Sequence, residues 1–222
     1  FLGEASVGVY HAGYSLANRT QDVVFVWLGM AGGPAMVAAL ERGGKAALAQ
    51  TAKEQASFMV LLTLPAAVGL ALVALPLSEL LIGPQLAQGA ARVVPWIAAG
   101  GFFSGVTTYY LHQAFTLGQR TRLLMAAMTF PAGLNLALNF LLVPRFGLDG
   151  AMWATTASYA AGAVASFTLG RRVIALPLPI DTLVKAGLAC LPMILVVSLL
   201  PDIDEVPELA LKAGLGALAY GV

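Results

Sequence analysis

The chain has 222 residues, of which 59% are hydrophobic and 10% are charged, and its formal net charge is +1. An average soluble domain carries about 25% charged residues, so this composition excludes a typical soluble domain. Because no long block of lysine and arginine occurs, a nucleic-acid-binding surface is excluded as well. We therefore expect the partners to be membrane lipids or membrane-embedded molecules, and no nucleic acid.

Six stretches reach the length of about 20 mostly apolar residues that a helix needs to cross the hydrocarbon core. They cover approximately residues 7–39, 57–82, 93–117, 123–143, 151–169 and 183–200, and a seventh, 209–222, is cut off by the end of the sequence. None shows the alternation of apolar and polar residues that a membrane strand requires. The sequence thus predicts an all-α polytopic bundle of about seven transmembrane helices in a single domain.

The segments between these stretches contain residues that favour turns. They are Glu41–Gly44, Ile82–Pro84, Leu117–Arg120, Pro144–Gly147 and Leu176–Pro179. Short connections make successive helices antiparallel neighbours. Glycine and alanine recur within the stretches, which lets helix backbones approach closely where lipid provides no hydrophobic drive to associate. We therefore expect a compact bundle.

Lysine and arginine are divided unevenly between the two sides of the predicted bundle. One side holds Arg42, Lys45, Lys53, Arg120, Arg122, Arg171, Arg172 and Lys185. The other side holds Arg92, Arg145 and Lys212, and Arg19 lies within the first span. Loops rich in lysine and arginine stay in the cytoplasm. The first side is therefore predicted to be cytoplasmic, with Phe1–Ser6 and Asp202–Glu208 outside.

Two segments carry a more specific pattern. The first, Leu2–Ala17, reads LGEASVGVYHAGYSLA, and the second, Asn139–Thr155, reads NFLLVPRFGLDGAMWAT. Both resemble segments of the oligosaccharide flippase family, which belongs to the multidrug/oligosaccharidyl-lipid/polysaccharide exporter superfamily. The order and separation of the segments fit that family, and the resemblance covers about residues 1–172 well and the remainder poorly.

The resemblance implies a transporter of 12–14 helices built from two related bundles, of which this chain is the second. The sequence begins without methionine and stops inside an apolar stretch, which agrees with this expectation. The implied function is a flippase that moves undecaprenyl-pyrophosphate-linked oligosaccharide across the bacterial inner membrane by alternating access. The implied partners are this substrate, membrane lipids and the N-terminal half of the same transporter. The alternatives are a cation-coupled multidrug extruder, and a non-transporting membrane scaffold or O-antigen ligase.

Arg19 and Asp22 lie three residues apart in the first predicted span, so they share one face of a helix. Charges within a membrane usually face an interior cavity or each other. Arg19 is therefore a candidate to donate to the substrate pyrophosphate, with Asp22 orienting it or taking up a coupling proton or cation. The alternative is a structural ion pair. The two residues lie near mid-membrane if residues 9–31 form the span, which the resemblance favours, and at the outer surface if residues 23–40 do.

Four polar residues of later spans complete the predicted substrate site. His112 and Gln113 follow two tyrosines late in the third span, where they are candidates to line a sugar path or to belong to an interfacial belt. Asn135 and Asn139 are one turn apart on the fourth span and share a face. They are candidates to donate to sugar hydroxyls or to bond a neighbouring helix.

No arrangement for covalent catalysis, no phosphate-binding glycine-rich loop and no His-Glu-x-x-His motif occurs in the sequence. Neither His11 nor His112 has a partner motif for a metal, and the lone Cys190 lacks a second thiol. The longest polar connection, Glu41–Gln55, is too short and too rich in alanine to serve as the catalytic loop of a ligase. We therefore expect neither enzymatic activity nor a bound metal or cofactor.

Overall fold

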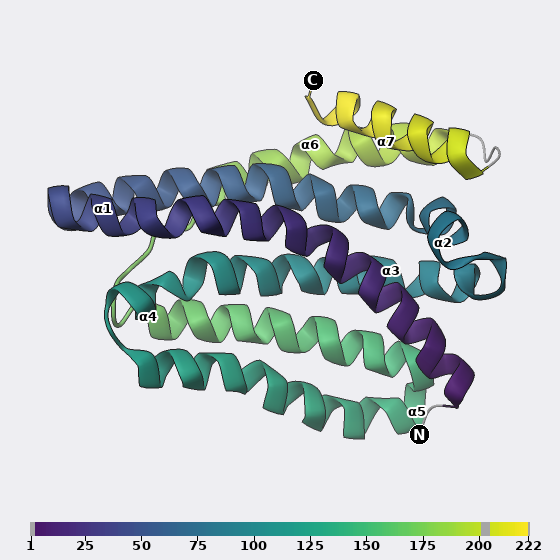
Figure 1. Ribbon diagram of the computed structural model, residues 1–222, viewed down its shortest axis with the longest axis horizontal. Coiled ribbons are helices and arrows are strands. Elements are labelled where there is room, and N and C mark those ends of the chain that lie inside the picture. Colours follow the sequence, from purple (N-terminus) through teal and green to yellow (C-terminus); the bar gives the residue numbers. More distant parts are fainter. Residues whose placement is uncertain (1–2, 201–204, 222) are drawn as a thin grey trace.

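The computed structural model describes residues 3–200 and 205–221, and all regular structure within them is helical. Figure 1 shows these helices as one bundle of elongated rods. Three of them are long and apolar enough to cross a membrane, namely α1 (Glu4–Leu72), α5 (Thr121–Gly170) and α6 (Ile180–Leu199). The predicted all-α membrane bundle is confirmed. Asp202 and Asp204 of the predicted outer loop lie outside the described residues, as do Phe1 and Leu2.

Helices α1 and α5 each fold back on themselves at one glycine. Gly44 has a φ of 65° and Gly147 a φ of 57°, a left-handed conformation that glycine adopts at little cost. Each long helix therefore consists of two arms, residues 4–43 and 45–72 in α1 and residues 121–146 and 148–170 in α5. The arms lie side by side in Figure 1, as the turn chemistry at both places predicts.

The region predicted as the longest polar connection, Glu41–Gln55, is helical apart from the turn at Gly44. The break between the two arms is thus the predicted turn around Gly44, and the rest of the predicted polar connection is helix. Alanine, glutamine, lysine and glutamate dominate this segment, and all four are strong helix formers that the polar pattern alone does not reveal. The second arm of α1 consequently begins at Lys45, twelve residues before the predicted start of the second span at Ser57.

Shorter elements connect the long helices, and they move the boundaries of the second and third predicted spans. Helix α2 (Ala74–Ile82) is separated from α1 at Val73, and α3 (Pro84–Val106) starts with a proline at its first position, where a missing N–H costs nothing. A π-helical turn, η1 (Thr107–Leu111), and α4 (Gln113–Leu117) complete that path. After α6, the chain ends in α7 (Glu205–Gly221).

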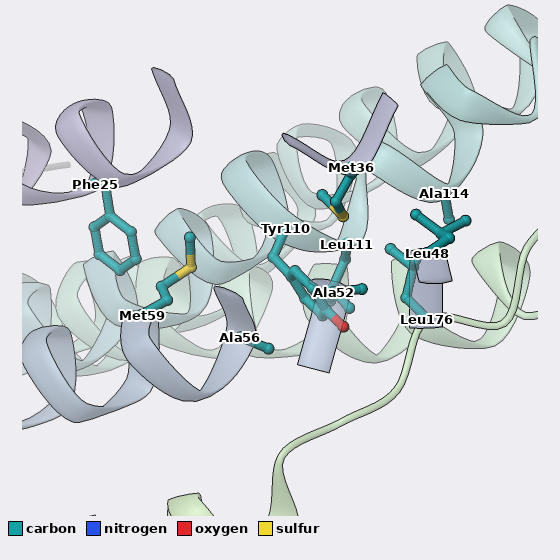
Figure 2. Packing of buried hydrophobic residues seen from close by; sticks show 10 residues of the cluster. All are labelled: Phe25, Met36, Leu48, Ala52, Ala56, Met59, Tyr110, Leu111, Ala114 and Leu176. Atoms are coloured by element: carbon teal, nitrogen blue, oxygen red, sulfur yellow. The ribbon is translucent and has the colours of Figure 1, made fainter. Parts of the chain in front are cut away.

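Two clusters of buried apolar side chains hold the bundle together. Figure 2 shows the first cluster, which joins both arms of α1 to η1 and α4 and contains Phe25, Met36, Leu48, Ala52, Ala56, Met59, Tyr110, Leu111, Ala114 and Leu176. The second cluster contains Ala17, Leu70, Ala74, Val93, Val94, Ile97, Ala98 and Met152. Since both clusters include residues of both arms of α1 and of the α3–α4 path, both arms of α1 pack against that path.

The two ends of the bundle carry different turns. The turn of α1 at Gly44, helix α4, both ends of α5 and the start of α6 lie at one end, and α2 lies at the other (Figure 1). The segments that flank the first group of turns contain the basic residues assigned above to the cytoplasmic side. Their orientation in a membrane stays a prediction.

Candidate functional site

Arg19 and Asp22 both lie on the exposed surface of the first arm of α1. Between them, Gln21 points the other way: it is 4% exposed and donates from Nε2 to the backbone oxygen of Ala98 on α3, over 3.0 Å. Because neighbouring residues on a helix point about 100° apart, this inward anchor turns both charged side chains away from α3.

The structure does not form an ion pair between Arg19 and Asp22. The described part of the chain contains other ion pairs, and Asp22 instead accepts a hydrogen bond from Nδ2 of Asn18, at 3.1 Å. The interpretation of the two residues as a structural pair is therefore not supported in this conformation. Arg19 is left with an exposed guanidinium on the same stretch of helix.

The contacts of Gln21 also place this turn of α1 along the length of the bundle. Its partner Ala98 lies near the middle of α3, and a Cβ added at Gly101 would meet Oε1 of Gln21 at 2.0 Å. Arg19 and Asp22 are thus level with the middle of α3, distant from the turns at both ends of the bundle. This arrangement agrees with residues 9–31 as the membrane span, which stays a prediction.

A row of polar side chains runs along α1 towards Asp22. Tyr10, Tyr14, Asn18 and Asp22 follow one another at intervals of four residues, so they lie on one side of the helix, with a gradual drift around it. Sequence reasoning missed the first three. The signal that could have identified them is this four-residue spacing of polar side chains.

Two tyrosines of this row contact the second arm of α5. The hydroxyl of Tyr10 hydrogen-bonds Oγ1 of Thr155 at 2.8 Å, and the hydroxyl of Tyr14 hydrogen-bonds that of Tyr159 at 3.2 Å. Both contacts join residues 145 positions apart, which shows that the first arm of α1 and the second arm of α5 run in the same direction. Thr155 and Tyr159 were also missed by sequence reasoning.

The predicted pair Asn135 and Asn139 continues the polar contacts on the first arm of α5. Asn135 donates from Nδ2 to Oγ1 of Thr155 over 3.3 Å. Asn139 donates to Oδ1 of Asn135 over 3.0 Å and to its backbone oxygen over 2.8 Å. Asn135 thus bonds the second arm of α5, whereas Asn139, among the described residues, bonds only within its own arm. Donation by either residue to sugar hydroxyls stays a prediction.

These contacts and the spacing of the row on α1 group residues from three helical arms into one feature, which we call the polar track. It consists of Tyr10, Tyr14, Asn18, Asp22, Asn135, Asn139, Thr155 and Tyr159. The track supplies hydroxyl and amide groups that both donate and accept hydrogen bonds, and a carboxylate that accepts them. Arg19 lies near Asp22 on α1 and adds a cationic donor. Such a set suits a ligand with many hydroxyl groups and an anionic group.

His112 and Gln113 lie apart from the polar track. His112 is 8% exposed, and its Nε2 lies 3.3 Å from Oγ of Ser166 on α5. Gln113 packs beside Gly33 of α1, where an added Cβ would lie 3.4 Å from its amide nitrogen. The structure thus encloses His112 between helices, directly after the π-helical turn η1. The role of His112 and Gln113 in lining a sugar path stays a prediction.

The described residues include no group of three or more histidine, cysteine, aspartate and glutamate side chains placed to hold a metal ion. Cys190 is a buried free thiol in α6. The polar track contains one carboxylate and neither thiol nor imidazole, so its chemistry is hydrogen bonding and charge recognition.

Comparisons with known proteins agree with this architecture. No protein-family model and no curated protein matches the chain. Among solved structures, the chain is similar to the lipid II flippase MurJ in an inward closed conformation, with a TM-score of 0.74 and 16% sequence identity. The likeness covers 95% of this chain and 45% of that chain. At this identity the likeness shows the fold alone, and this chain spans about half the length of the flippase.

Proposed function

We propose that this chain is the second half of a flippase that moves undecaprenyl-pyrophosphate-linked oligosaccharide across the bacterial inner membrane. The observation that carries this proposal is the polar track, which runs through a bundle whose surface is otherwise rich in apolar side chains. The fold supports transport as the class of function, because a solved structure of similar fold is named as a lipid II flippase.

The exposure of Arg19 and Asp22 supports a binding cavity on this face of α1. Charged groups inside a membrane are costly and usually face protein or water, so an exposed pair at the middle of the bundle calls for a covering partner. The N-terminal half of the transporter is the proposed partner. A cavity between the two halves would then be lined by the polar track, and rocking of the halves would open it to each side in turn.

The proposed role of each residue follows from its side-chain chemistry. The guanidinium of Arg19 presents several N–H donors in a planar fork, which matches the oxygens of a pyrophosphate. The amides of Asn135 and Asn139 and the tyrosine hydroxyls suit sugar hydroxyls. The polyprenyl tail needs no polar partner and remains in the lipid.

The test uses full-length transporter variants in cells that depend on it for surface polysaccharide. Arg19→Ala should abolish export while the amount of protein in the membrane stays nearly normal, and Arg19→Lys should restore export partly, because the ammonium keeps the charge without the forked geometry. Arg145→Ala is the matched control. It removes an exposed arginine outside the polar track that has no ionic partner among the described residues, and it should leave export unchanged.

A double variant separates substrate binding from mutual neutralisation. If Arg19 acts only by neutralising Asp22, the combination of Arg19→Ala and Asp22→Ala should restore transport, since no unpaired charge would remain. Because the two side chains form no ion pair, we expect no recovery. Recovery would overturn the assignment of Arg19 as a substrate contact.

The runner-up function is a cation-coupled multidrug extruder, and the position of Asp22 gives it specific support. Asp22 is exposed on the face of the proposed cavity and accepts a hydrogen bond from Asn18, so it is placed to take up a proton or cation. Measuring export of fluorescent drugs beside export of polysaccharide in the same cells distinguishes the two functions. Loss of drug export with normal polysaccharide in a deletion strain would favour the extruder.

A further inference from the structure

A second site lies at the end of the bundle that carries the turn of α1 and helix α4. An open pocket of about 800 Å³ is lined there by three arginines, Arg120, Arg122 and Arg172. Arg120 and Arg122 come from the beginning of α5, and Arg172 follows its end. Both ends of α5 lie close together in Figure 1, because the helix folds back at Gly147. Residues 50 positions apart in the sequence are thereby brought to one pocket.

The turn before α5 fixes the position of the first two arginines. The N–H of Arg120 donates to the oxygen of Phe115 over 2.8 Å, and the N–H of Gln119 donates to that of Thr116 over 3.1 Å, which is the hydrogen-bond pattern of a Schellman motif. Gln119 occupies its left-handed position with a φ of 52°, where glycine is the usual residue.

Close packing holds the segment after α5 against this turn. A Cβ added at Gly118 would lie 2.1 Å from Cγ1 of Val173, so only a residue without a side chain allows the approach. The N–H of Val173 in turn donates to the oxygen of Gly170 over 2.9 Å. Arg172 is therefore held beside Arg120 and Arg122 by its neighbour, and the pocket is a defined part of the fold.

The positive charge of this pocket has no protein counter-charge. All three arginines are exposed, no described residue forms an ion pair with them, and none of the lining residues is acidic. Gathering like charges without a counter-ion is unfavourable, and a bound anion would relieve that repulsion. The first turn of α5 adds backbone N–H groups that the helix itself cannot satisfy, and these also favour an anion.

We propose that this pocket binds a doubly charged phosphate group, either a phosphomonoester or a diphosphate. Arginine suits such a group because its planar fork of N–H donors matches phosphate oxygens. Basic pockets at the cytoplasmic ends of membrane helices bind anionic lipid headgroups, which makes a lipid one source of the phosphate and a soluble anion the other. The site lies at the end of the bundle, apart from the polar track, and goes beyond the proposed transport function.

Uneven distribution of arginine across a membrane protein explains basic residues at this end without any binding site. The experiment therefore compares two triple variants of the full-length protein. One changes Arg120, Arg122 and Arg172 to glutamine. The other changes Arg42, Lys45 and Lys53 to glutamine in the same way. These basic residues belong to the same predicted side but do not line the pocket, so the control removes the same charge from the same side.

Binding is measured by native mass spectrometry of the purified protein in detergent, titrated with phosphatidic acid, phosphatidylcholine or pyrophosphate. The wild type should retain phosphatidic acid in preference to phosphatidylcholine. The pocket variant should bind phosphatidic acid roughly a hundredfold more weakly, and the control variant should stay within about threefold of the wild type. If pyrophosphate displaces phosphatidic acid, a soluble anion is a sufficient ligand. If pyrophosphate does not displace it, the ligand is a lipid headgroup.

Equal weakening in both triple variants would show a general charge effect and overturn the proposal. Failure of the wild type to bind either phosphatidic acid or pyrophosphate would overturn it as well. Folding is checked by thermal unfolding of each variant, and Arg172→Gln alone provides a milder variant. Because Arg172 is exposed and unpaired, this variant should fold normally and still lose part of the affinity.

Discussion

In the first arm of α1, the part nearer the N-terminus meets α5 through hydroxyl groups, whereas the part nearer Gly44 packs through apolar side chains. Tyr10 and Tyr14 hydrogen-bond to Thr155 and Tyr159. Phe25, in contrast, is 1% exposed and belongs to the cluster of Figure 2. In a membrane, apolar packing and interhelical hydrogen bonds both hold helices together, but a hydrogen bond there contributes only about 0.6 kcal/mol on average.

The proposed function predicts that changes in the apolar part lower mainly stability, and that changes in the polar part lower mainly transport. A variant in each part of α1 can therefore test whether stability and transport are separable.

The largest expected effect on stability comes from the apolar cluster. Phe25→Ala should lower the free energy of unfolding by about 3 kcal/mol, because it leaves a cavity beside Gly105. A Cβ added at Gly105 would lie 2.3 Å from the ring of Phe25, which shows how closely the two helices approach. Denaturation of the purified full-length protein in detergent measures the change. Val23→Ala, on an exposed position of the same helix, should have little effect.

A matched substitution on the facing helix sharpens this prediction. Gly105→Ala should also destabilise the protein, by about 1–3 kcal/mol, because the added methyl group overlaps the ring of Phe25. Combining it with Phe25→Leu should restore part of the stability, since the smaller side chain vacates the overlapping space. Additive losses in the double variant would contradict direct packing between these two positions.

Substitutions in the polar track should lower stability less than those at Phe25 and Gly105, and should lower transport more. Tyr10→Phe removes the hydroxyl that bonds Thr155 and should cost about 0.5–1.5 kcal/mol. Thr155→Val removes the other partner, and a double-mutant cycle isolates their interaction. Polysaccharide export should fall in Tyr10→Phe by more than the loss of folded protein explains. If export simply follows protein level, the track is structural.

The smallest effect is expected for the exposed ion pair between Arg92 and Asp149 at the other end of the bundle. Their atoms lie 2.8 Å apart, but the side chains are 67% and 32% exposed. Ion pairs in contact with water contribute at most about 1 kcal/mol, and salt screens them. Arg92→Ala should therefore change the unfolding free energy by less than that and leave export normal. A large loss of stability would show that lipid or protein covers this pair.

Several features of this protein follow from the sequence by itself. The length of the apolar stretches and the scarcity of charge predict a helical membrane bundle, because each backbone group must find its partner within its own helix. Glycines at positions 44 and 147 predict sharp reversals, since glycine permits a positive φ. Asn135 and Asn139 share a face because a helix brings residues four apart together. All of these depend on interactions between residues that are close in the sequence.

The tertiary structure decided which side chains meet across helices. The bond from Tyr10 to Thr155 joins residues 145 positions apart, and the enclosure of His112 depends on Ser166 in another helix. Asp22 has Asn18 as its partner and not Arg19, although both lie within one turn of it. Spacing along one helix determines which residues share a face. Which neighbour that face meets depends on how all the helices pack, and this is why the polar track emerged only from the folded chain.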